Sequence, residues 1–334
     1  MMTQRPLSHT AYSVLDLAPV LEGATAAQSF QNSLDLAQHA EKWGYRRYWL
    51  AEHHNMPGIA SSATSVVIGH IAGGTETIRV GSGGIMLPNH APLVIAEQFG
   101  TLASIYPDRI DLGLGRAPGT DFQTARALRR DEKGGADFEQ LLSELRGFFT
   151  GTDGKKVKAV PGEGVEVPIW LLGSSGYSAA LAGRLGLPFA FASHFNPEHT
   201  LDALSLYRNS FEPGVLDEPY AMTGVNVIAS ETDEEAEYLA SSQKQQFLEL
   251  VRGTPGKLKP PVENVEQLMM PHERVALERQ LGSSIYGSVD SVRSKLSAFA
   301  EETASDELII VSQVYSHEAR LRSYDLTAGI MKGE

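Results

Sequence analysis

A glutamate and two histidines, Glu52, His53 and His54, follow one another in the first third of the chain. They come directly after the aromatic and apolar run 45–50, which has the composition of a short β-strand. In a parallel α/β protein the carboxyl ends of the strands face the active site. A carboxylate and two imidazoles at such a strand end can hold, take up or release protons. We therefore expect Glu52, His53 and His54 to lie where chemistry takes place.

The same histidine pair is a weak indication of a metal site. Adjacent residues of a strand point to opposite faces, so the rings of His53 and His54 cannot easily share one ion while the strand conformation lasts. The sequence has no His-Glu-x-x-His motif and no clustered set of carboxylates. We therefore predict that the protein binds no metal.

A second group of residues could bind an anion. Ser174, Ser175 and Ser178 lie at or just inside the start of a predicted helix, 177–185. Free backbone N–H groups, hydroxyls and the helix dipole together favour a phosphate there. Arg116, at the end of a neighbouring predicted strand, would add a fixed positive charge. The alternatives are an ordinary serine N-cap and an arginine that lies on the surface.

Glycines stand at two neighbouring strand ends, Gly83-Gly84 and Gly113 with Gly115. Because glycine has no Cβ, a flat ligand can lie close to the backbone there. Gly113 and Gly115 also resemble part of a dinucleotide-binding fingerprint, but the third glycine is displaced to Gly119, which disfavours a Rossmann site. Together with the predicted anion site, the glycines indicate a site for a phosphorylated planar cofactor.

Strand-like and helix-like patterns alternate along the chain and would position these residues. The predicted strands are 11–17, 45–50, 78–83, 109–115, 168–172, 189–193, 220–228 and 307–312. The predicted helices are 27–43, 61–73, 93–105, 121–130, 136–149, 177–185, 197–211, 233–251, 289–302 and 318–331. Segment 155–167 is expected to be a hairpin or loop excursion, and 253–271 a long loop.

Eight strand–helix units without a linker favour a (β/α)₈ TIM barrel that forms a single domain over residues 1–334. Mostly apolar strands, such as 78–81 and 308–311, suit a parallel sheet that is buried on both sides. Patterning alone leaves an open, doubly wound sheet as the alternative. Trp43, Trp49 and Trp170 lie in apolar segments and are expected in the core.

Composition excludes several classes of protein. The 334 residues include no cysteine, which rules out disulfides and cysteine-based zinc or iron–sulfur sites. The net charge of −13 and the absence of an uninterrupted basic cluster disfavour nucleic-acid binding. The N-terminal residues have no apolar signal-peptide core, and no apolar run is long enough to cross a membrane. We expect a cytoplasmic protein that does not associate with membranes.

Taken together, these motifs resemble those of the bacterial luciferase-like flavin monooxygenases. The resemblance is carried by Ala-Glu-His-His at 51–54, by Gly-Ser-Gly-Gly-Ile-Met-Leu-Pro-Asn-His-Ala-Pro at 81–92, and by Arg-Ile-Asp-Leu-Gly-Leu-Gly-Arg at 109–116. Gly-Ser-Ser at 173–175 follows in the same order, and the likeness covers essentially the whole chain. It implies a TIM barrel with an insertion after strand seven and FMN bound at the strand carboxyl ends.

The resemblance also implies roles for single residues. Glu52 and His53 match a Glu-His pair at the flavin edge, whose histidine is implicated in catalysis, so the resemblance implies that His53 and Glu52 are the catalytic residues. Gly83 and Gly84 match a pair joined by a cis peptide bond under the flavin ring. The phosphate contacts are matched by Arg116, Ser174, Ser175 and Ser178. The chain departs from the luciferase α subunit at Gly115, where that subunit has a cysteine near the flavin, so light emission is not implied.

The activity implied by the resemblance is that of a two-component FMN-dependent monooxygenase. A separate flavin reductase would supply reduced FMN, and O₂ would be used to oxygenate a small organic substrate. A homodimer packed through the helices after strands two and three is implied as well. Two alternatives stay open, a deazaflavin-dependent oxidoreductase on the same fold and a non-catalytic flavin-binding protein. The loop 253–271 would be either a lid or a solvent loop.

Overall fold

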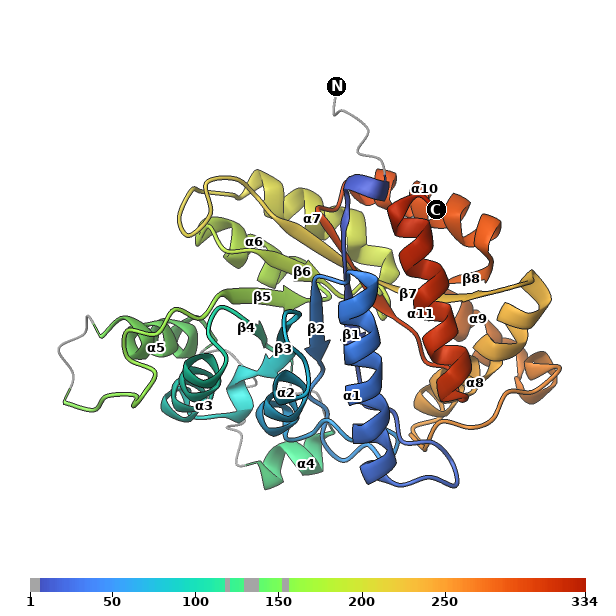
Figure 1. The fold of residues 1–334 in the computed structure, drawn as a ribbon, viewed down its shortest axis with the longest axis horizontal. Helices are drawn as coiled ribbons and strands as arrows, with labels where there is room; N and C mark the ends of the chain where they lie inside the picture. Colours follow the sequence, from blue (N-terminus) through green and yellow to red (C-terminus); the bar gives the residue numbers. More distant parts are fainter. Residues whose placement is uncertain (1–6, 118–120, 129–137, 152–155) are drawn as a thin grey trace.

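The computed structural model describes residues 7–117, 121–128, 138–151 and 156–334. A short 3₁₀ helix, η1 (Leu7–His9), leads into the first strand. The chain enters that strand on the side where the C-terminus lies, and the first helix runs back alongside it (Figure 1). Within the described residues, no helix is both long enough and apolar enough to cross a bilayer.

The strands form a closed parallel barrel, which confirms the predicted fold class. Strands β1 to β7 and β9 make the ring, which is closed by the pairing of β6 with β7 and of β9 with β1. Their bounds are β1 (Ala11–Asp16), β2 (Arg47–Leu50), β3 (Arg79–Met86), β4 (Ile110–Gly115), β5 (Ile169–Gly173), β6 (Phe189–Phe191), β7 (Ala221–Ser230) and β9 (Glu307–Val311). Each agrees with a predicted strand to within a few residues.

Helices surround the barrel (Figure 1). They are α1 (Ala26–Trp43), α2 (Thr64–Gly73), α3 (Pro92–Ile105), α4 (Phe122–Ala127), α5 (Phe138–Thr150), α6 (Gly176–Arg184), α7 (Thr200–Asn209), α8 (Asp233–Val251), α9 (Pro271–Gln280), α10 (Val289–Thr303) and α11 (His317–Lys332). Their ends follow local chemistry: Thr25 caps the start of α1, and Gly44, with φ of 85°, ends it in the left-handed conformation. The predicted helix residues 129–130 and 136–137 lie outside the described residues.

The insertion between β7 and β9 contains structure that the sequence pattern did not indicate. Besides α9 it holds a 3₁₀ helix, η4 (Val265–Leu268), and a strand, β8 (Ile285–Ser288). Strand β8 pairs with the last residues of β7, Val227–Ser230, beyond the barrel ring. The predicted long loop over 253–271 thus includes the short 3₁₀ helix η4, and the four-residue β8 was too short for its alternation to be recognised.

The first part of this insertion is pinned against the loop after β1. Leu258 is fully buried, its N–H donates to the carbonyl of Val20, and its own carbonyl accepts from Glu22. The distances are 2.9 and 2.8 Å. Gly58, in the loop after β2, lies so close that a Cβ there would be 2.2 Å from the carbonyl oxygen of Gly256. These contacts argue against the solvent-loop alternative for this part of the segment.

Segment 156–168 contains no strand in the residues that the structure describes. Of the two structures expected for this segment, the structure agrees with the loop excursion and not with the hairpin. It packs against α3, because a Cβ on Gly100 would lie 2.2 Å from the Cα of Gly162. Residue 155, at the start of the predicted excursion, lies outside the described residues.

The barrel interior is filled by side chains that alternate along the strands. The interior cluster comprises Leu15, Trp49, Ala51, Trp170, Ala190, Met222, Ile309 and Val311. Trp49 and Trp170 meet edge to face, with ring centroids 5.2 Å apart. Both are buried, as predicted, and Trp43 packs against the outer core instead. Because alternate residues of β2 point inward, Arg47, Trp49 and Ala51 occupy successive interior levels.

Charged residues close the end of the barrel where the strands begin. The guanidinium of Arg47 donates to Asp111 at 2.7 Å and to Glu307 at 3.1 Å, which ties β2 to β4 and β9. Asp111 also accepts from Arg79 at 2.6 Å, and Tyr220 donates to Glu307 at 2.9 Å. Asp111 and Glu307 are fully buried, so these donors replace the hydrogen bonds that water would otherwise give to each carboxylate.

We predict that Arg47→Ala destabilises the fold by about 3–5 kcal/mol, because it leaves two buried carboxylates without their shared partner. Its exposed neighbour Arg46, which donates to the Tyr220 hydroxyl at 3.0 Å, is the matched control, and its replacement by alanine should cost about 1 kcal/mol or less. Urea unfolding followed by circular dichroism measures both. Equal losses in the two variants would contradict the role given to Arg47.

Candidate functional site

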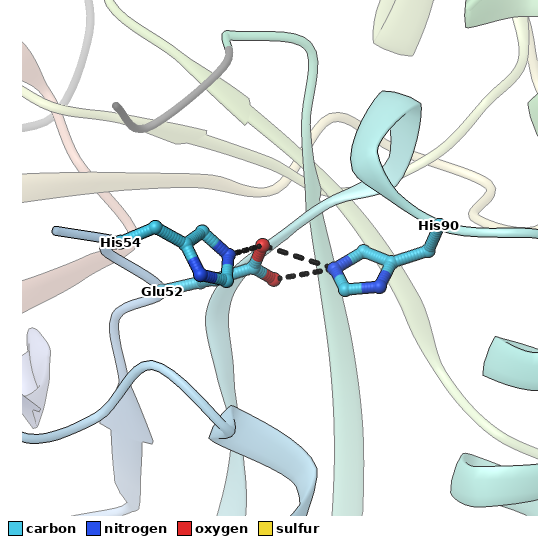
Figure 2. Close-up of side chains that lie close together, drawn as sticks. All are labelled: Glu52, His54 and His90. Atoms are coloured by element: carbon cyan, nitrogen blue, oxygen red, sulfur yellow. Dashed lines mark hydrogen bonds and ion pairs between the residues drawn. The ribbon is translucent and has the colours of Figure 1, made fainter. Parts of the chain in front are cut away.

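Glu52 is the centre of a hydrogen-bonded cluster at the carboxyl end of β2. Its carboxylate accepts from Nε2 of His54 at 2.8 Å and from Nε2 of His90 at 2.9 and 3.0 Å. The Met86 backbone N–H and the Asn89 amide add donors at 3.1 and 3.3 Å. Figure 2 shows the carboxylate between the two imidazoles, one from the loop after β2 and one from the loop after β3. Glu52 thus joins these two loops.

The surroundings of Glu52 stabilise its anion. Burial alone would raise the pKa of this carboxyl group. The hydrogen bonds from His54 and His90 and from the Met86 N–H outweigh burial and hold the pKa at about 2. A group this acidic is a poor proton donor or acceptor near neutral pH. The geometry therefore favours a positioning role for Glu52 over direct proton transfer.

The same cluster is a possible metal-ligand set. One oxygen of Glu52 and one nitrogen each of His54 and His90 lie within 4.8 Å of one another. Two imidazoles and a carboxylate can bind a divalent transition metal. The sequence argument considered only the pair His53–His54, and the structure brings in His90, which it missed. The five hydrogen bonds already satisfy the carboxylate without an ion, so our expectation of no metal stays a prediction.

The glycines in the second halves of β3 and β4 let the two strands approach closely. The peptide bond between Gly83 and Gly84 is cis, as the sequence predicted. A Cβ on Gly84 would lie 2.8 Å from the carbonyl oxygen of Gly113, and one on Gly113 would lie 2.1 Å from that of Ser82. A Cβ on Gly115 would lie 2.8 Å from the sulfur of Met86. Packing within the protein is therefore itself a reason for glycine at these positions.

Arg116 and the start of α6 come together at the strand carboxyl ends. The guanidinium carbon of Arg116 lies 4.1 Å from the ring centroid of Tyr177, in the first turn of α6. Ser175 is the N-cap residue, and its side chain makes no capping hydrogen bond. Ser178 is buried, and the carbonyl of Ser174 accepts from Asn196. Three groups therefore suit a phosphate here: the Arg116 guanidinium, the Ser175 hydroxyl, which makes no capping hydrogen bond, and the N-terminus of α6.

His53 has a neighbour that the sequence analysis missed. His194 follows β6, and burial together with the nearby His53 lowers the pKa of His194 to about 4. The backbone carbonyl of His194 accepts from the Asn226 amide at 2.8 Å. The only signal in the sequence was a histidine directly after the predicted strand 189–193, and no spacing connects it to His53.

The chain is similar in sequence and in structure to known proteins. A sequence model of the family described as luciferase-like monooxygenase matches residues 10–307. An Escherichia coli (strain K12) protein named luciferase-like monooxygenase is 52% identical over 96% of each chain. The crystal structure of apo-MsnO8 superposes with a TM-score of 0.90 at 38% identity, covering 96% of this chain and 98% of that one.

A more distant solved structure has the same fold. It is the oxygenating constituent of 3,6-diketocamphane monooxygenase from Pseudomonas putida, in complex with FMN. Its TM-score is 0.73 at 16% identity, and the match covers 98% of this chain and 99% of that one. At this identity the likeness concerns the fold alone.

We predict that Glu52→Gln lowers stability most at neutral pH. The folded-state pKa of about 2 lies below the ordinary 4.5, so the stabilisation is complete above pH 4.5 and is lost as the pH falls towards 2. The shift corresponds to about 3 kcal/mol at pH 7, about 1 kcal/mol of which should be gone at pH 4. Urea unfolding at both pH values measures it, with the exposed Glu76→Gln as control. A pH-independent difference between wild type and Glu52→Gln would contradict the assignment.

Proposed function

The chain belongs to the luciferase-like monooxygenase family, and we propose that it is an FMN-dependent monooxygenase of the two-component type. Reduced FMN from a separate reductase and O₂ would be used to oxygenate a small organic substrate. The observation that carries the proposal is the meeting of Arg116 with the N-terminus of α6, at the strand ends that also bear Glu52 and His53.

The described residues fit the phosphate end of FMN. Arg116 would pair with the phosphate, and the N–H groups in the first turn of α6, with the hydroxyls of Ser174, Ser175 and Ser178, would donate to it. Gly83, Gly84 and Gly113 have no side chain, so the flavin ring would be able to lie against backbone in the second halves of β3 and β4. Reduced FMN would supply the electrons for oxygen activation, and the protein would orient the ring and exclude water.

The two residues expected to be catalytic would have different tasks. His53 would hold or move a proton beside the reacting oxygen. Glu52, which stays ionised, would fix His54 and His90 and so set the loops after β2 and β3 around the cofactor. Leu258, paired with Val20, would keep the first part of the insertion in place over the loop that follows β1.

Two other functions use the same site. A deazaflavin coenzyme would carry hydride in place of oxygen chemistry, and a flavin-binding protein would not turn over at all. Visible absorbance titrations with FMN and with the deazaflavin separate the cofactors. Oxygen uptake with reduced FMN then separates the enzyme from the carrier. Tight binding of the deazaflavin alone would overturn the FMN proposal.

We also propose a homodimer, with a flavin reductase as a separate partner. The helices after strands two and three present apolar side chains to solvent: Val66 of α2 is 70% exposed, and Val94 and Ile105 of α3 are 42% and 58% exposed. Burying them against a second copy would remove that apolar surface from water. Sedimentation equilibrium decides the point, and a monomer at micromolar concentration would refute it.

We predict that Arg116→Ala weakens FMN affinity about tenfold to a hundredfold, because it removes a charge-assisted contact worth about 1.5–3 kcal/mol. Riboflavin, which has no phosphate, should bind both proteins alike, and fluorescence quenching measures each ligand. Arg184→Ala is the control, since Arg184 lies at the far end of α6 and pairs weakly with Glu139 at 3.5 Å. Equal weakening of FMN and riboflavin would exclude a phosphate contact.

We predict that His53→Ala leaves FMN binding nearly unchanged but slows the oxidation of bound reduced FMN by O₂ about 10²–10⁴-fold, the usual contribution of a positioned acid–base group. His54→Ala should affect this rate less and stability more, because His54 donates to the buried Glu52. Stopped-flow absorbance with protein in excess over FMN measures the rates. Identical traces for wild type and His53→Ala would remove the catalytic role.

A further inference from the structure

We infer that His194 is a neutral hydrogen-bond donor that presents its Nε2–H, beside His53, to a carbonyl-type oxygen bound at the carboxyl end of the barrel. The inference rests on the function proposed above, because it concerns the same site. It names a second histidine, which follows β6, on the opposite side of the ring from β2. It also names the class of oxygen that this histidine would bind.

A chain of buried side-chain hydrogen bonds holds the backbone of His194 in place. The Asn226 side chain donates to the backbone carbonyl of His194 at 2.8 Å and itself accepts from Gln243 at 2.8 Å. Gln243 in turn accepts from the hydroxyl of Tyr286 at 3.0 Å. Asn226 and Gln243 are buried, and they come from β7 and α8. This chain anchors the backbone at His194 to two separate elements.

The ring itself packs against a glycine of β7. A Cβ on Gly224 would lie 2.3 Å from Nδ1 of His194 and 3.1 Å from Cε1. Glycine is therefore required for the imidazole to lie there. The residue as a whole is partly exposed, and Nε2, unlike Nδ1, is not among the buried nitrogens without a partner, so we take Nε2 as the nitrogen that can meet a ligand.

The environment of Nδ1 decides the tautomer. This nitrogen is buried and has no hydrogen-bond partner within the part of the chain that the structure describes. A buried N–H without an acceptor is costly, whereas an unpaired acceptor nitrogen is tolerated better. The proton of the neutral ring therefore belongs on Nε2. Protonating Nδ1 as well would bury an unpaired N–H beside His53, in accord with a pKa of His194 lowered to about 4 by burial and by His53.

A neutral N–H donor at a reaction site suits an oxygen that carries partial negative charge. It can polarise a carbonyl or stabilise charge that develops on an oxygen, without acting as an acid. Because the ring is uncharged, it offers no ion pair to a carboxylate or phosphate. The matching partner is a neutral carbonyl oxygen, which either the flavin ring or the substrate could supply. Both sources share this chemistry, and the experiment below separates them.

Nitrogen NMR of ¹⁵N-histidine-labelled protein tests the inference without turnover. The His194 signals, assigned with His194→Gln, should report an Nε2–H tautomer that stays neutral between pH 5 and 8. Addition of FMN, and separately of cyclohexanone as a neutral ketone probe, should shift the Nε2 signal in at least one case. A shift with FMN assigns the flavin carbonyl, and one with cyclohexanone alone assigns the substrate. An Nδ1–H tautomer, titration near pH 6.5, or no shift with either ligand would overturn the inference.

Variants give a second readout. His194→Phe should weaken binding of the ligand that shifts the signal about 3- to 10-fold, the range for one neutral hydrogen bond, whereas His194→Gln keeps an N–H donor and should stay within about twofold. The exposed His199→Gln is the matched control. Equal affinities for His194→Phe and His194→Gln would reject the donor role. Failure here would leave the dependence of FMN binding on Arg116 untouched, so the two proposals fail separately.

Discussion

The guanidinium of Arg47 is the interaction on which the arrangement of the barrel depends. It lies inside the ring and joins β2 to Asp111 of β4 and Glu307 of β9, strands that do not neighbour β2. Because none of these charged groups can be buried without its partners, β2, β4 and β9 must place them at the same level of the barrel. The tryptophans above Arg47 then fill the middle of the barrel, and only the carboxyl end is left for binding and chemistry.

The two buried carboxylate systems at opposite ends of the barrel are built differently. Asp111 and Glu307 face arginines, whose charge does not depend on pH in the physiological range. Glu52 instead faces two imidazoles and uncharged donors, the Met86 backbone N–H and the Asn89 amide. Arginines thus surround the buried carboxylates at the structural end, and imidazoles surround the buried carboxylate at the end that we assign to function.

The sequence predicted the barrel because strand-like and helix-like patterns alternate along it and its strands are mostly apolar, both of which are local signals. It missed β8, whose four residues form a strand only by pairing with β7. The candidate site divides in the same way. Glu52, His90 and Arg116 all stand in recognisable motifs, but only the fold reveals that His90 is a partner of Glu52 and that His194 lies near His53. His90 is 38 residues from Glu52 in the sequence. His194 follows β6, whereas His53 follows β2.

The seam between the first and last strands of the ring has a consequence for biosynthesis. Ser13 of β1 donates to Glu307 of β9, 294 positions later, and β9 also pairs with β7. A chain leaving the ribosome has no partner for that edge of β1 until almost all of it has been made. Contacts so distant in sequence form slowly and leave strand edges unpaired meanwhile. The growing polypeptide therefore passes through a long interval as an open, incomplete ring, in which chaperones can protect its unpaired edges.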